Sequence, residues 1–138
     1  MAYSYLNKHE AMFNKRKSSI YKGKDKFSIF GIGDYSFSPY KIVISSLYKT
    51  ICFKLISQYE GKPIIVDDTC YQLDFNNLKE AEYIYEALNS NELQSLLHTL
   101  IFKDAKRVVT KSLLMRLDLA QLCRDKGFTI NSQRFINR

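Results

Sequence analysis

The feature that most constrains the fold is a series of short strand-like segments in the first half of the chain. They are rich in β-branched and aromatic residues, and turn-forming residues such as glycine, proline and aspartate separate them. The segments are Phe27–Gly33, Lys41–Ser45, Thr50–Ile56, Ile64–Val66 and Cys70–Asp74. Their number and spacing predict a small, mostly antiparallel sheet or partial barrel of about five strands.

Helical periodicity appears on both sides of these segments. Apolar side chains recur at helical spacing over residues 3–17, which predicts an N-terminal helix. The pattern returns at Asn77, a typical N-cap residue, and continues as two apolar stripes to Ile101. Asp118 is expected to cap a last helix that stops at Gly127. The fold class is therefore α+β, with one N-terminal helix and two or three C-terminal helices.

A single domain over residues 1–138 accommodates all of these segments, since the sequence has no repeat and no linker-like stretch. We expect a basic helical segment at 1–26, the sheet at 27–75, helices at 76–126 and a loosely held tail at 127–138.

The net charge of +7 is unevenly distributed. Residues 1–26 hold seven basic and two acidic residues, and residues 105–138 hold eight and two. Residues 58–104 hold nine acidic and three basic residues. A clustered positive field attracts polyanions, which favours nucleic acid as a partner over a membrane surface. A basic surface that is merely solvated is the alternative.

The sequence also indicates the compartment. No stretch approaches the ~18 uncharged apolar residues of a membrane span. Lys8 and Glu10 interrupt any apolar core of a secretory signal. The three cysteines are an odd number without a CxxC pair, which disfavours a disulfide framework or a zinc site. We therefore expect a cytoplasmic protein.

Several catalytic motifs are incomplete in this chain. Gly31 and Gly33 begin a dinucleotide-binding pattern, but Ser36 stands where its third glycine is needed. The two prolines are not adjacent, so an (Asn/Asp)-Pro-Pro-(Tyr/Phe) loop for gripping an exocyclic amine is absent. Asp34 with Glu60-Gly61-Lys62 faintly resembles the acidic–acidic–lysine set of metal-dependent nucleases. A solvated hairpin turn is the favoured interpretation of Glu60–Pro63.

The stretch that follows the first two glycines is the best candidate for reading bases. It places aromatic rings, hydroxyls and a lysine on an expected loop, where they could stack on bases, bond to base edges or touch phosphate. These residues are Asp34, Tyr35, Ser36, Phe37, Tyr40 and Lys41. From residue types alone, a hairpin whose aromatic rings fold into the core is the favoured interpretation.

Short motifs between Tyr5 and about Leu122 make the chain resemble a known family. In sequence order they include Lys15-Arg16-Lys17-Ser18, Phe27–Phe37 with its Gly33-Asp34-Tyr35 run, Asp67-Asp-Thr-Cys-Tyr71, Leu88-Asn-Ser90 and Asp104-Ala-Lys-Arg107. In this order they resemble the C-terminal target recognition domain, or TaqI-like specificity domain, of N6-adenine DNA methyltransferases from restriction-modification systems. Leu88-Asn-Ser90 also resembles recognition domains of type I restriction specificity subunits. One departure is Val108, which stands where the family usually has proline.

The resemblance implies a module that recognises double-stranded DNA in a sequence-specific manner but does not transfer a methyl group. An upstream catalytic domain of the parent enzyme would bind S-adenosylmethionine, and this segment would need no cofactor. The expected backbone contacts are Lys15, Arg16, Lys17, Ser18, Lys106 and Arg107. The expected base-reading residues are Asp34, Tyr35, Ser36, Tyr40 and Lys41. The alternatives are a protein-interaction module whose acidic 58–104 region docks a catalytic partner, and the weak nuclease interpretation.

Overall fold

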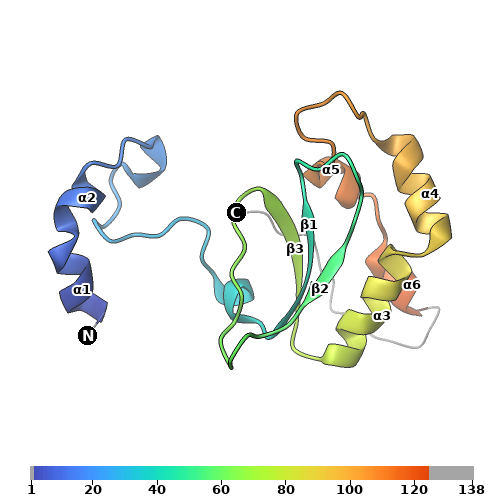
Figure 1. The fold of residues 1–138 in the computed structure, drawn as a ribbon, viewed down its shortest axis with the longest axis horizontal. Helices are drawn as coiled ribbons and strands as arrows, with labels where there is room; N and C mark the ends of the chain where they lie inside the picture. The colour runs from blue at the N-terminus through green and yellow to red at the C-terminus, as the bar shows by residue number, and fades with distance from the viewer. Residues whose placement is uncertain (1, 125–138) are drawn as a thin grey trace. The chain divides into compact units, whose positions relative to one another are not determined.

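The structure is a computed structural model that describes residues 2–124, apart from the side chains of residues 122 and 123 (Figure 1). The chain forms two compact units, residues 1–32 and residues 33–138. We call them the N-terminal unit and the sheet unit. The prediction of one domain over the whole chain stays a prediction, because compactness alone does not decide which parts fold independently. The expected tail at 127–138 lies outside the described residues.

The N-terminal unit contains helices α1 (Ala2–Lys8) and α2 (Glu10–Asn14) and a short 3₁₀ helix, η1 (Ser19–Tyr21). The helix predicted over residues 3–17 is therefore divided at His9, which is the N-cap residue of α2. No side chain is fully buried in residues 2–32.

The strand predicted at Phe27–Gly33 is absent, and this part of the chain forms turns and irregular structure. Gly31 has a φ angle of 74°, a conformation that interrupts a strand. The Phe27 ring packs edge-on against the rings of Tyr3 and Phe13, with centroids 5.8 and 5.3 Å away. Its aromatic side chain thus joins the helices instead of a sheet.

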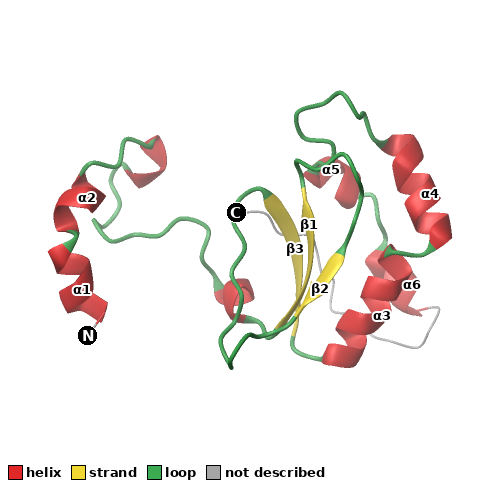
Figure 2. Cartoon of the chain, in the orientation of Figure 1, coloured by secondary structure: helices red, strands yellow, loops and turns green. Residues whose placement is uncertain are grey.

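The sheet unit begins with the 3₁₀ helix η2 (Asp34–Phe37) and holds the strands β1 (Tyr40–Ser45), β2 (Lys54–Ile56) and β3 (Cys70–Phe75). The strands form an antiparallel sheet in the order β2-β1-β3, shown in yellow in Figure 2. The α+β class and the antiparallel sheet are confirmed, but the described residues form three strands instead of about five.

Two other predicted segments differ from the structure for separate reasons. Ile64 and Ile65 are 39% and 45% exposed and lie in irregular structure, although their residue types favour strands. Ile51 and Phe53 are buried in the core, but the strand that pairs with β1 starts only at Lys54. In the predicted segment Thr50–Ile56, the buried residues therefore precede the residues that pair with β1.

Four helices follow the sheet: α3 (Leu78–Leu88), α4 (Asn91–Leu100), α5 (Lys111–Leu114) and α6 (Leu119–Arg124). Asn77 accepts a hydrogen bond from the Lys79 amide at 2.9 Å, which confirms the predicted cap of α3. Asp118 likewise accepts from the Gln121 amide at 2.8 Å. None of the helices in the described residues is long and apolar enough to cross a membrane.

The two faces of the sheet differ in character. Ile42, Leu73 and their same-face neighbours lie in the apolar core, and α3 contacts all three strands. The opposite face carries Lys41, which is paired in register with Asp74 of β3 and Ile56 of β2. The turn around η2 is hydrogen-bonded to this polar face.

Candidate nucleic-acid interface

The basic cluster of the N-terminal unit divides into exposed and engaged side chains. Lys15 and Lys17 are exposed, whereas Arg16 donates hydrogen bonds to the carbonyl oxygens of Ser28, at 2.7 Å, and Lys26. Its guanidinium group also lies 3.9 Å from the centroid of the Tyr21 ring. Arg16 therefore holds the chain after α2 against the helix, and its expected phosphate contact stays a prediction.

Two further polar groups of this unit have local partners. Ser18 accepts a hydrogen bond from the Ile20 amide at 3.4 Å and caps η1. Lys26 forms an ion pair with Glu10 at 2.8 Å, and this lysine holds the pKa of the Glu10 carboxyl below its ordinary value. These contacts leave Lys15 and Lys17 as the members of the predicted cluster that are both basic and exposed.

The predicted base-reading residues are placed at very different depths. Asp34 is exposed, and Tyr35 and Tyr40 are half-buried. Ser36 is only 2% exposed, and its hydroxyl accepts a hydrogen bond from the Gly33 amide at 3.3 Å. Phe37 is 56% exposed, although residue types alone favoured a core position for the aromatic rings of this stretch.

Lys41 is the least accessible of the predicted DNA contacts, at 1% exposure. Its Nζ donates a hydrogen bond to the Ser38 carbonyl oxygen at 2.8 Å. Burial lowers the pKa of Lys41 below its ordinary value of 10.5, and the charge of Asp74 acts in the opposite direction. Lys41 and Ser36 are both buried, and each forms a hydrogen bond within the sheet unit. Their DNA contacts stay predictions.

The second predicted contact region is the long loop between α4 and α5. Lys106 is exposed, and Arg107 Nη1 donates a hydrogen bond to the Ser46 hydroxyl at 2.5 Å. Ser46 in turn donates from its hydroxyl to the Thr69 carbonyl oxygen at 2.8 Å. The Thr69 amide and hydroxyl both donate to Asp67. The structure thus links Asp67–Tyr71 with Asp104–Arg107, two motifs that are far apart in the sequence.

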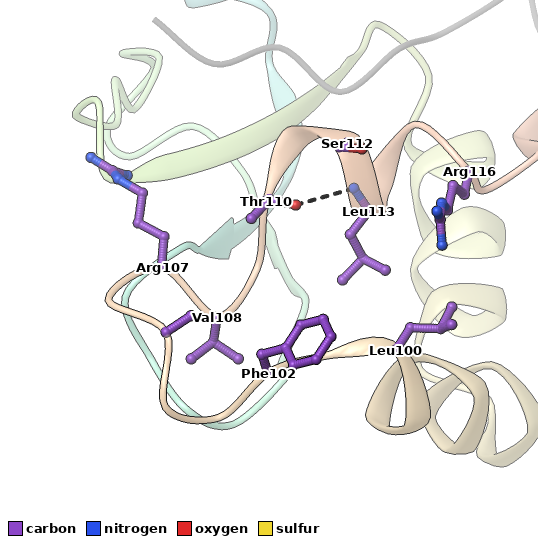
Figure 3. Close-up of a pocket in the computed structure, with 9 residues that line it drawn as sticks. Leu100, Phe102, Arg107, Val108, Thr110, Ser112, Leu113 and Arg116 are labelled. Atoms are coloured by element: carbon purple, nitrogen blue, oxygen red, sulfur yellow. Dashed lines mark hydrogen bonds between the residues drawn. The ribbon is translucent and has the colours of Figure 1, made fainter.

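A pocket of about 210 Å³ lies between this loop, the end of α4 and α5. Figure 3 shows the Phe102 ring in the pocket near Leu113, with Arg107 extending away on one side and Arg116 on the other. Thr110 accepts a hydrogen bond from the Leu113 amide at 3.2 Å and thereby caps α5. Phe102 is 82% exposed, so the pocket opens to solvent beside an aromatic ring.

Exposed positive charge is concentrated in the chain segment that contributes most of the pocket lining, and Arg107 and Arg116 line the pocket itself. Residues 103–116 hold five basic residues and one acidic residue, and all six are exposed. The basic residues are Lys103, Lys106, Arg107, Lys111 and Arg116. We call these five side chains the basic surface. Sequence reasoning identified two of them and missed Lys103, Lys111 and Arg116, although their density along the chain was a usable signal.

The residues of the weak nuclease pattern do not form a three-ligand cluster. Tyr59 and Lys62 exchange backbone hydrogen bonds of 3.0 and 2.9 Å, so Glu60 and Gly61 form the tip of the expected hairpin turn. Both tip residues have positive φ angles, 48° and 72°. Among residues 2–124, no group of three or more His, Cys, Asp or Glu side chains is arranged to hold a metal ion.

Comparison with known proteins gives one informative similarity. The chain is 45% identical over 122 residues to the Type II methyltransferase M.NspV of Nostoc sp. (strain ATCC 29411 / PCC 7524). The aligned region covers 88% of this chain and 25% of that methyltransferase. No protein-family model matches the chain, and no solved structure matches it significantly. The chain is therefore related to a segment of a type II methyltransferase that amounts to about a quarter of the enzyme.

Proposed function

We propose that this chain recognises a specific sequence in double-stranded DNA, as the target recognition part of an N6-adenine methyltransferase of a restriction-modification system. The methyltransferase relationship rests on the similarity to M.NspV. The adenine N6 specificity and the target recognition role rest on the motifs of the sequence, among them Gly33-Asp34-Tyr35 and Asp67-Asp-Thr-Cys-Tyr71.

The basic surface is the observation that carries the proposal. Its five cationic side chains belong to the loop before α5, to α5 itself and to the turn after it, and Asp104 is the only acidic residue among residues 103–116. Phosphate contacts made by such groups supply most of the non-specific affinity of DNA-binding proteins and fix their register on the duplex. Two buried residues anchor the end of this loop, because Val108 and Val109 are only 4% and 1% exposed.

Arg107 contributes to this surface in two ways. One guanidinium nitrogen is bonded to Ser46, while the residue as a whole remains exposed. A guanidinium group has five N–H donors, so it can keep this bond and still contact a phosphate. The bond to Ser46 would fix the position of Arg107 relative to β1 and to the Asp67–Tyr71 motif before DNA arrives.

Selection of bound duplexes from a random pool tests the proposal. The full chain is mixed with randomised double-stranded DNA, bound molecules are separated by gel shift, and their sequences are determined. We expect enrichment of one short motif. Salt-sensitive binding without enrichment would reduce the function to non-specific binding. Absence of any DNA binding, together with capture of a methyltransferase catalytic domain, would favour the protein-interaction alternative.

In the parent enzyme, the catalytic domain would bind S-adenosylmethionine and transfer the methyl group. This chain alone would not bind the cofactor. The 138 residues contain neither a complete cofactor glycine loop nor a Pro-Pro loop. We expect no methyl incorporation when the chain is incubated with labelled S-adenosylmethionine and DNA. Incorporation above background would contradict this part of the proposal. Mg²⁺-dependent cleavage of the same DNA would instead support the nuclease alternative.

A further inference from the structure

We propose that residues 33–40 form a preformed turn in which Phe37 contacts a base step of the DNA, while the buried Lys41 is a positioning residue that fixes the turn. This inference rests on the proposed function and names the part of the molecule that determines specificity. We call residues 33–40 the reading turn. Lys41 would act through the turn, and this inference replaces the direct DNA contact that the sequence predicted for it.

The exposure pattern of the turn singles out Phe37. Its two neighbours, Ser36 and Ser38, are 2% and 8% exposed, whereas Phe37 is 56% exposed. The chain thus buries two small polar residues and presents the large apolar one between them. Apolar side chains contact DNA through the thymine methyl group or as wedges at a base step. Phe37 has the chemistry for either contact.

Hydrogen bonds from the sheet hold the turn on both sides of Phe37. Lys41 Nζ donates to the Ser38 carbonyl oxygen at 2.8 Å, and Gln72 Nε2 donates to the Tyr35 carbonyl oxygen at 3.4 Å. The Ser38 hydroxyl donates to Asp74 Oδ2 at 3.2 Å. Lys41 and Gln72 lie on the polar face of the sheet, on adjacent strands β1 and β3, and both are buried.

A buried lysine is unfavourable unless its charge is compensated and its donors are used. Lys41 meets this requirement by bonding to a carbonyl of the reading turn and by lying opposite Asp74 in the strand register. An apolar residue at this position would avoid the desolvation of a charge but could not hold the Ser38 carbonyl. A turn ordered in advance also loses less conformational entropy when DNA binds. This is the role that we assign to Lys41.

Four single variants of the full chain test the inference against random duplex DNA. Phe37→Ala removes the contacting ring, and Lys41→Met removes the positioning bond while keeping an unbranched side chain. Gln72→Met removes the second bond without a change in charge, and it serves if Lys41→Met does not fold. Ile42→Val is the matched control, because it alters the opposite, core-facing side of the same strand.

We expect Phe37→Ala and Lys41→Met to lose discrimination at the same base positions, by roughly tenfold. Their non-specific affinity should change little, since phosphate contacts are made elsewhere. Amide hydrogen exchange over residues 34–38 should accelerate in Lys41→Met and in Gln72→Met but not in Phe37→Ala. Ile42→Val should keep both the selected motif and the exchange protection of the turn.

Two results would overturn the inference while leaving the proposed function intact. One is an unchanged motif in Phe37→Ala and Lys41→Met when the original chain selects a motif. The other is an unchanged exchange rate of the turn in folded Lys41→Met. An original chain that selects no motif would overturn the proposed function itself, and with it the DNA contact of Phe37. Loss of self-association in Phe37→Ala, with the motif retained, would assign the ring to a protein contact instead.

Discussion

The N-terminal unit and the sheet unit are stabilised by different kinds of contact. Among the described residues, fifteen buried side chains form the apolar core of the sheet unit, whereas residues 2–32 contain no fully buried side chain. Without such a core, the N-terminal unit relies on ring contacts and on Arg16, which bonds to carbonyl oxygens across its loop. The sheet unit is stabilised by its apolar core, and its residues Lys103, Lys106 and Lys111 are exposed to solvent.

This difference shows that a basic sequence cluster is not by itself a DNA-binding surface. The cluster Lys15-Arg16-Lys17 and the pair Lys106-Arg107 are equivalent as sequence signals, yet Arg16 is largely occupied by internal contacts. Arg16 of the first cluster therefore has a structural role, and the second pair lies in a segment with further exposed cations.

The largest expected effect tests the apolar core on which the sheet unit depends. Leu73 is fully buried in the centre of the sheet. Leu73→Ala should lower the free energy of unfolding by about 2–5 kcal/mol, because it removes buried apolar volume and leaves a cavity. Chemical denaturation of the full chain measures this loss. Leu78→Ala, at a position that is 40% exposed, is the control and should have a much smaller effect. Equal losses in the two variants would contradict the packing described for β3.

A smaller effect is expected in the N-terminal unit. Arg16→Ala removes the hydrogen bonds to Ser28 and Lys26 and the contact with the Tyr21 ring. Because charged donors form the stronger hydrogen bonds, local opening should become easier by about 1–3 kcal/mol. Amide hydrogen exchange over residues 13–28 measures this change. The exposed neighbour Lys17 provides the comparison, since Lys17→Ala should leave exchange unchanged. Similar exchange in both variants would mean that Arg16 does not hold this unit.

The smallest effect is a pH dependence that arises from Lys41. Burial lowers the folded-state pKa of Lys41 below 10.5, so the unfolded chain binds the proton more strongly. Below the folded-state pKa the destabilisation is fully present, and it disappears as the pH rises toward 10.5. The stability of the original chain relative to Lys41→Met should therefore increase with pH in this window. Denaturation at several alkaline pH values measures the difference, and a constant difference would contradict the burial of a charged lysine.

The parts of the fold that were predictable from the sequence are those governed by local rules. Periodicity located α3, and short polar side chains located the caps at Asn77 and Asp118. Strand propensity located β1 and β3, which pair with each other in the sheet. It failed at Phe27–Gly33, because residue type does not show whether a pairing strand is available, and the Phe27 ring instead packs on α1 and α2.

The candidate site was less predictable, because its key contacts join distant residues. A lysine side chain is normally exposed, and nothing in the sequence near Lys41 indicates that Asp74 of β3 lies opposite it. The bond between Arg107 and Ser46 spans 61 residues. Residue type alone favoured a core position for Phe37, which was wrong. Its exposure becomes evident only once the hydrogen bonds of the reading turn are known.

The salt dependence of duplex binding tests the central claim most directly. The variant Lys103→Ala/Lys106→Ala removes two exposed cations of the basic surface and leaves the Arg107–Ser46 bond intact. Its matched control is Lys62→Ala/Lys79→Ala, which removes two exposed lysines from the hairpin turn and from α3. If the basic surface binds phosphates, the slope of log affinity against log salt should flatten by up to about two units in the first variant. It should stay unchanged in the control. Equal slopes in the original chain and both variants would contradict DNA binding by the basic surface.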